Sequence, residues 1–240
     1  MDDKPPQRFP TTNWSVILDA ASPSSESAQA AMSQLCARYR PPVFKFILEK
    51  CRNLHHAEDL TQGFFEFAIR NSVLQRARKE RGRFRNFLGA SIQHFLHNQH
   101  DRAMAAKRGG RHRIEPLDTD LADSLEAASD SSGDSRAFDR EWALALVTRA
   151  MEALAADYDA RSRRTVHDVL LPYLTRSASG QDYESAGAAL GISKGAAEQA
   201  CRALRSRFGA ILRREVALTV SRPEEIEEEL RHLLAILGDG

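Results

Sequence analysis

The sequence predicts an all-α fold made of two small helical domains joined by a flexible acidic linker. Apolar residues recur at helical spacing through most of the 240 residues, whereas period-two alternation and β-branched runs are scarce. A hydrophobic content of 42% suffices to build cores, and 28% charged residues favours a soluble protein. An Asp- and Ser-rich stretch, poor in aromatics, separates two helical blocks between Glu115 and Ser135.

These patterns divide the chain into five segments. A segment without enough apolar side chains cannot form a core, so we expect the linker to be disordered. The predicted segments are an N-terminal extension over 1–27, a first helical domain over 28–110, the linker over 111–137, a second helical domain over 138–214, and a C-terminal helical extension over 215–240.

The first domain is expected to contain three helices. Pro41-Pro42 should kink or split the first helix, because proline lacks a backbone donor. The second helix spans about 57–70, and the third about 84–107. The apolar stripe of the third helix comprises Phe84, Phe87, Leu88, Ile92, Phe95 and Leu96.

The second domain begins with a helix near Phe138, whose inward residues include Trp142 and Leu144. A helix over Val166–Leu174 follows and should be disturbed by Pro172. After a helix-turn-helix pattern, a last helix should start with Ser221 as its N-cap and Pro223 in its first turn.

The segment from Tyr183 to Ser193 has the pattern of a helix-turn-helix, in which a short helix and a tight turn precede a second helix. Small residues at Ala186 and Ala189 would let the helices approach, and Gly191 supplies a left-handed turn. Ser193 should cap the second helix, which Ile192, Ala197 and Leu204 would hold against the scaffold.

The exposed face of this second helix is expected to contact duplex DNA. Gln and Arg match the donor and acceptor pattern of purine edges, and Glu can accept from cytosine. An ordinary helical hairpin with a solvated face is the alternative. The predicted DNA-binding residues are Lys194, Glu198, Gln199, Arg202 and Arg205.

A basic and aromatic run opens the third helix of the first domain. The net charge is only +1, but the acids between Arg70 and Arg113 are Glu80 and Asp101 alone. Aromatics beside cations suit unstacked single-stranded bases. A core stripe with a solvated surface explains the same run equally well. The candidates for single-stranded DNA are Arg83, Arg85, Phe87, Gln93, His94, Asn98, Arg102, Lys107 and Arg108.

Other chemistry has little support in the sequence. The histidines at 94, 97 and 100 drift around a helix, and no acid or cysteine at a matching interval completes a metal site. Neither a nucleophile nor a phosphate-binding glycine loop accompanies the acids near Asp59. We therefore expect no enzymatic activity, cofactor or metal. Isolated cysteines and the lack of a signal peptide or membrane span favour a cytoplasmic protein.

Taken in order, three segments resemble a bacterial RNA polymerase sigma factor of the extracytoplasmic-function type. They cover, with their flanking helices, most of residues 28–214. Their order and the acidic linker between them make the combination more specific than any single motif. The segments are Ala57-Glu58-Asp59-Leu60-Thr61-Gln62-Gly63-Phe64-Phe65, Gly82-Arg83-Phe84-Arg85-Asn86-Phe87-Leu88 and the helix-turn-helix from Tyr183 to Phe208.

The resemblance implies a role for each domain. The first would be region 2, with Glu58, Asp59 and Gln62 docking on the clamp helices of the polymerase β′ subunit. The stretch from Phe84 to Arg102 would melt the −10 element and hold a flipped base. The second domain would be region 4, which reads the −35 element. The implied partners are core RNA polymerase, through its β′ and β subunits, and promoter DNA.

The chain departs from the family pattern at two places that suggest regulation. Gly63 stands where relatives commonly have an acid, so we hypothesise that a Ser/Thr kinase adds charge by phosphorylating Thr61. A threonine that packs locally is the alternative. The helix over 215–240 is absent from minimal sigma factors, and we expect it to pack on a DNA-binding domain and regulate it, in place of an anti-sigma protein, or to act as a structural cap.

A second function class remains open at this stage. A helix-turn-helix regulator with an N-terminal sensor domain would bind duplex DNA unaided, whereas a sigma factor should need core polymerase. A metal-dependent nucleic-acid enzyme is a third and weaker possibility.

Overall fold

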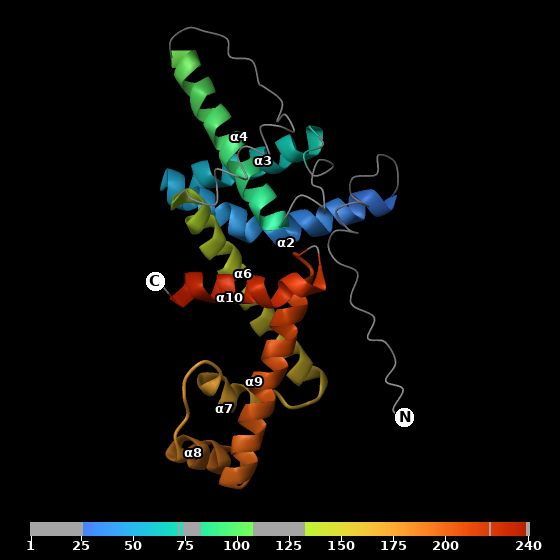
Figure 1. The fold of residues 1–240 in the computed structure, drawn as a ribbon, viewed down its shortest axis with the longest axis vertical. Coiled ribbons are helices and arrows are strands. Elements are labelled where there is room, and N and C mark those ends of the chain that lie inside the picture. The colour runs from blue at the N-terminus through green and yellow to red at the C-terminus, as the bar shows by residue number, and fades with distance from the viewer. Residues whose placement is uncertain (1–25, 72, 74–82, 108–132, 221, 239–240) are drawn as a thin grey trace. The chain divides into compact units, whose positions relative to one another are not determined.

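A computed structural model of the chain describes residues 26–71, 73, 83–107, 133–220 and 222–238. Every regular element in these ranges is a helix, which confirms the prediction of an all-α fold (Figure 1). None of the helices in these ranges combines the length and apolarity needed to cross a bilayer. Most of the predicted N-terminal extension and linker lies outside the described residues.

The chain forms two compact units, and the first is built from both ends of the sequence. The first unit comprises Met1–Ala145 and Val216–Gly240, and the second comprises Leu146–Glu215. The C-terminal extension therefore belongs to the first unit. The first boundary falls inside a helix that begins at Gly133, before the expected end of the linker at 137.

Within the described residues, the first unit contains six elements and the last two residues of a helix that begins in the second unit. Helix α2 packs on α3, and α3 packs on α4. The elements are α2 (Glu26–Cys51), α3 (Leu54–Arg70), α4 (Phe84–Lys107), the first part of α6 (Gly133–Ala160), the short 3-10 helix η4 (Pro223–Glu225) and α10 (Ile226–Gly238).

Helix α2 continues through Pro41 and Pro42, so of the two outcomes that we expected, a kink or a split, the split is wrong. An internal proline costs roughly 3 kcal/mol in a helix because it removes a backbone hydrogen bond. Tyr39 and Val43 are buried on either side of the proline pair. Burial of the flanking side chains offsets that cost and keeps the helix continuous.

An aromatic cluster at the core of the first unit includes two residues that we expected in the second domain. Trp142 stacks on Tyr39, with ring centroids 5.0 Å apart and planes 7° apart. Phe138 meets Phe46 edge to face at 5.5 Å. A Cβ atom at Gly89 would lie 3.0 Å from the Phe138 ring, so glycine permits this close approach. The start of α6 is thus part of the first unit.

The second unit contains the rest of α6, α7 (Arg164–Leu170), the 3-10 helix η3 (Leu171–Tyr173), α8 (Gly180–Leu190) and, as far as Glu215, α9 (Lys194–Ala217). Pro172 lies in η3, where α-helical geometry ends as predicted. The buried side chains of this unit include Leu154, Leu170, Ala197, Cys201 and Leu204.

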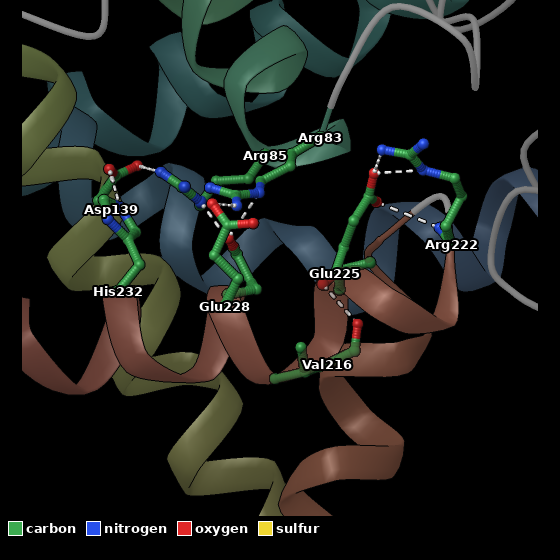
Figure 2. Close-up of polar contacts among 10 residues, drawn as sticks. Arg83, Arg85, Asp139, Val216, Arg222, Glu225, Glu228 and His232 are labelled. Atoms are coloured by element: carbon green, nitrogen blue, oxygen red, sulfur yellow. Dashed lines mark hydrogen bonds and ion pairs between the residues drawn. The ribbon is translucent and has the colours of Figure 1, made fainter.

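Helix α10 buries one polar and two apolar side chains in the first unit. Leu230, Leu233 and Glu229 are the buried residues of α10, whereas Leu234 is exposed. Arg222 donates its backbone N–H to Glu225 Oε2 at 3.1 Å at the start of η4 (Figure 2). Ser221, the expected N-cap, lies outside the described residues.

Candidate nucleic-acid interface

Helix α8 begins with a reciprocal cap. Ser179 Oγ accepts a hydrogen bond from the Asp182 backbone N–H at 3.2 Å, and Asp182 Oδ2 accepts one from the Ser179 backbone N–H at 2.7 Å. Such a box satisfies two backbone donors that the first turn of a helix leaves free. Arg176 also pairs with Asp182, at 3.0 Å. These contacts orient the first helix of the helix-turn-helix.

Charge and hydrogen bonds at this cap favour ionised Asp182. The Arg176 guanidinium, followed by the hydrogen bonds from Ser179, lowers the pKa of Asp182 from 3.8 to about 2. Asp182 likewise raises the pKa of Arg176 above its ordinary value through their hydrogen bond.

The turn between α8 and α9 has the predicted glycine geometry. Gly191 has φ of +66° in the left-handed region and ends α8. A Cβ atom at Gly187 would lie 2.8 Å from the Ile192 carbonyl oxygen. The close approach between α8 and the turn therefore occurs at Gly187. Ala189 is exposed, and Ile192 is 40% exposed, so neither has the packing role that we assigned to it.

Helix α9 starts with the predicted cap and has two distinct faces. Ser193 Oγ accepts a hydrogen bond from the Ala196 backbone N–H at 3.3 Å. Ala197 and Leu204 are buried as expected. Lys194, Gln199 and Arg202 are exposed, and Glu198 is half-exposed. Lys194 pairs with Glu184 at 2.7 Å, and Arg202 with Glu198 at 2.5 Å.

Arg205 does not belong to the exposed face, which corrects its assignment to DNA. Its guanidinium donates to the Tyr173 carbonyl at 2.8 and 3.1 Å, and to the Arg176 carbonyl at 2.7 Å. These acceptors lie at and just after η3. Because its Nε and Nη2 donors are used on these backbone carbonyls, Arg205 holds the segment before α8 against α9.

The two arginines at the start of α4 are bound to carboxylates of the first unit. Arg83 pairs with Glu228 at 2.9 Å and with Glu229 at 3.0 Å. Arg85 pairs with Glu229 at 3.0 Å and with Asp139, which His232 approaches to 3.3 Å (Figure 2). We name Arg83, Arg85, Asp139, Glu228 and Glu229 the arginine cluster.

Burial distinguishes the two arginines. The side chain of Arg85 is 3% exposed, so in this conformation it is not accessible to DNA, in contrast to the prediction from the sequence. Burial lowers the pKa of the Arg85 guanidinium, but Glu229 and Asp139 outweigh it and leave that pKa above its ordinary value. Arg85 is therefore a buried cation held by two carboxylates. Arg83 is half-exposed.

The aromatic residues at the start of α4 also face inward. Phe84 and Phe87 are buried, and Phe84 lies 5.0 Å from the ring of Tyr39. Phe87 thus packs in the core of the first unit and is not presented for stacking on a base. The alternative of a core stripe, which we left open, describes this part of α4.

The remainder of α4 offers polar groups of mixed accessibility. Gln93 is half-buried, and its Nε2 has no hydrogen-bond partner among the described residues. Asn98 and His94 share a hydrogen bond of 2.8 Å, and Arg102 is half-exposed. Lys107 is the last residue of α4 but its side chain is not described, and Arg108 lies outside the described residues.

Helix α3 presents the predicted polymerase-docking residues on its exposed face. Glu58, Asp59 and Gln62 are exposed, and Gln62 Nε2 donates to Glu66 Oε1 at 3.1 Å. Asn53, which the sequence reasoning missed, caps the helix by accepting from the His56 backbone N–H at 2.9 Å. An asparagine just before the helical stretch was the available signal.

Thr61 lies on the opposite side of α3, so our premise that it is at the surface is wrong. The residue is buried together with Ala57, Phe64 and Ala68, which recur at helical spacing. Its hydroxyl donates to the Ala57 carbonyl at 2.7 Å. This is the local packing role that we weighed against phosphorylation.

Within the described ranges, no three His, Cys, Asp or Glu side chains lie close enough to hold an ion. No protein-family model, curated protein or solved structure matches the chain.

Proposed function

We propose that the chain is a transcription initiation factor of the sigma type, which docks on core RNA polymerase and recognises promoter DNA. The helix-turn-helix of the second unit would read duplex DNA. The α3 face of the first unit would bind polymerase. No enzymatic activity is part of the proposal.

The observation that carries the proposal is the geometry of the helix-turn-helix. A left-handed Gly191, a serine cap at Ser193 and a buried face through Ala197 and Leu204 orient α9. That orientation leaves Gln199 and Arg202 exposed. Side chains of this kind in the first turns of a second helix are the groups that reach base edges in the major groove.

The α3 face supports the polymerase-binding half of the proposal. Glu58 and Asp59 are adjacent exposed carboxylates, and Gln62 follows one turn later. An acidic helix surface suits a basic partner surface, and such charges set the rate and register of docking. Thr61 has no part in this face because it is buried.

Fewer residues than the sequence suggested would take part in melting the −10 element of the promoter. Asn98 and Arg102 are partly accessible on the later turns of α4. Arg102 would contact phosphate, and the Asn98 amide would contact a displaced base. Arg83 and Arg85 would take part only if α10 moved, since α10 supplies two of their carboxylate partners.

Co-purification with core RNA polymerase tests the proposal. Asp59→Ala should abolish or strongly weaken the binding seen with the wild-type chain. Glu152→Ala is the matched control, because it removes an exposed carboxylate from α6 in the second unit and should leave binding unchanged. Equal binding by all three proteins would remove α3 as the docking surface.

A helix-turn-helix regulator is the alternative, and burial of Arg85 and Phe87 favours it. Those two residues leave the first unit with fewer groups for single-stranded DNA. A regulator binds duplex DNA without polymerase. Binding of the free chain to a specific duplex, with no affinity for core polymerase, would establish this alternative.

Arg202→Ala separates base recognition from phosphate contact. If Arg202 makes a bidentate base contact, the variant should lose about 1–3 kcal/mol at one promoter position. An equal loss on every promoter would assign Arg202 to phosphate. Transcription from promoters mutated one position at a time provides the measurement.

A further inference from the structure

The arginine cluster joins segments that are distant in the sequence. Arg83 immediately precedes α4, Arg85 lies in its first turn, Asp139 lies on α6, and Glu228 and Glu229 lie on α10 (Figure 2). Three of the ion-pair distances within the cluster are 2.9, 3.0 and 3.0 Å. The C-terminal helix thus places two carboxylates against the cations of α4.

The carboxylates from α10 reverse the sign of the local charge. The two arginines with Asp139 carry one net positive charge, and Glu228 with Glu229 change it to one net negative charge. A net positive site attracts a phosphate backbone, whereas a net negative site repels it. Helix α10 therefore changes the sign of the charge that a phosphate backbone would meet at this end of α4.

Carboxylate and phosphate make the same demands on arginine. Both accept paired N–H donors from the planar guanidinium, and both are favoured by its fixed charge. Glu229 accepts from Arg85 Nε at 3.0 Å and lies 3.0 Å from Arg83 Nε, so one carboxylate bridges the two cations. A backbone phosphate between the same two arginines would replace that bridge.

The cluster is graded from an exposed outer pair to a buried inner pair. The side chains of Arg83 and Glu228 are 21% and 64% exposed, whereas those of Arg85 and Glu229 are 3% and 1% exposed. The outer pair can separate without opening the core. Besides Glu229, Leu230 and Leu233 are the buried residues of this 13-residue helix, and Ile226, Ile236 and Leu237 are half-buried.

We propose that α10 is a built-in competitor of single-stranded DNA for Arg83 and Arg85. The proposal rests on the proposed function, because it regulates the melting surface of the first unit. With α10 in place, carboxylates occupy the cations. When α10 is displaced, Arg83 and then Arg85 become free to bind the backbone of the displaced promoter strand.

Single-stranded DNA binding by the full chain, without polymerase, tests the competition. The probe is a fluorescent oligonucleotide without self-complementarity, and the measurement is anisotropy. Glu228→Gln should bind about two- to fivefold more tightly than wild type, because it removes one exposed ion pair and one repelling charge. Because the Glu228 side chain is exposed, its substitution should not disturb folding, and a change in DNA affinity would not reflect misfolding.

Two further variants separate competition from a change in total charge. Glu224→Gln removes the same charge from exposed η4, where no described contact joins Glu224 to Arg83 or Arg85, and should leave affinity at the wild-type value. In an Arg83→Gln background, Glu228→Gln should no longer increase affinity. The salt dependence of Glu228→Gln should steepen by about 0.7 in logarithmic slope for each added phosphate contact.

Equal effects of Glu224→Gln and Glu228→Gln would overturn the proposal, as would an effect that persists without Arg83. Failure of both Glu228→Gln and a folded Glu229→Gln to bind the oligonucleotide would also overturn it. In a Trp14→Phe background, Trp142 fluorescence reports whether the first unit of each variant is folded, since Trp142 is then the only tryptophan and is buried there. Polymerase binding is measured separately, so loss of the proposed function is distinguishable from failure of the competition.

Discussion

The helix-turn-helix of the second unit is built from neighbours in the sequence, whereas the arginine cluster of the first unit is built from three segments that are far apart in the sequence. Ser193 caps α9 through a residue three positions away, and Ser179 caps α8 through Asp182 over the same separation. Arg85 instead bonds to Glu229, which is 144 positions away. Local backbone chemistry shapes the first site, and tertiary packing shapes the second.

This difference determines how each site responds to change. Loss of a local cap or turn residue disturbs one helix junction, because the adjacent elements retain their own contacts. Loss of one member of a buried ion network leaves the remaining charges without partners in a low-dielectric interior. The arginine cluster should therefore be the more sensitive site for stability, and the helix-turn-helix the more sensitive site for recognition.

The largest effect should come from Arg85→Met. This change leaves Asp139 and Glu229 buried without their shared cation, and breaking a buried pair in this way costs about 3–5 kcal/mol of unfolding free energy. Urea unfolding followed by Trp142 fluorescence measures it, in a background with Trp14→Phe so that Trp142 is the only tryptophan.

Arg231→Met provides the comparison for that experiment. It removes an arginine from an exposed position of α10 and should change the unfolding free energy by less than about 0.5 kcal/mol. If Arg85→Met also changed it by less than 1 kcal/mol, the cluster would be no more than a surface ion pair, and the contrast between the two sites would disappear.

An intermediate effect is expected from Gly187→Ala in the helix-turn-helix. The added methyl group would lie 2.8 Å from the Ile192 carbonyl oxygen, so the backbone of the turn must shift. We expect a loss of about 1–3 kcal/mol, the usual range for overpacking. Hydrogen exchange of the α8 and α9 amides measures the local loss.

Gly195→Ala is the matched substitution in the next helix. Its added methyl group would meet nothing within 4 Å, and alanine should stabilise α9 by about 0.5–1 kcal/mol. A loss of stability for Gly187→Ala together with a gain for Gly195→Ala would support the view that this site depends on one close backbone approach. Equal signs would contradict it.

The smallest effect should be the acid sensitivity of the α8 cap. The pKa of Asp182 is lowered from 3.8 to about 2, so its contribution to stability is complete above the ordinary value. The contribution is lost as pH falls from about 4 toward 2, because the unfolded chain takes up the proton first. Carboxyl chemical shifts of Asp182 give the pKa directly.

Asp182→Asn isolates this contribution from the titration of other acids. The difference in α8 amide protection between wild type and Asp182→Asn should be present at pH 5 and should shrink toward pH 2. A difference that is constant across that interval would mean that the cap does not depend on ionisation.

Periodicity and cap chemistry predicted the elements whose causes are local. The bounds of α4 agree at both ends with the predicted 84–107, and Gly191 and Ser193 have the expected conformations. Thr61 was misplaced although its helical spacing from Ala57, Phe64 and Ala68 identifies the buried face. A closer use of the same local signal would have found it.

The sequence pattern did not identify the packing partners of several side chains, because tertiary contacts determine them. An apolar helix face shows that Trp142 is buried, but not that its neighbour is Tyr39 in the first unit. A basic residue has the same sequence signature whether it is solvated, bonded to backbone carbonyls as Arg205 is, or held by carboxylates as Arg85 is. Spacing along one helix specifies which side is apolar or charged. Which residues pack against that side depends on contacts between segments that are far apart in the sequence. For that reason, only the folded structure shows where the C-terminal helix packs and which carboxylates bind Arg83 and Arg85.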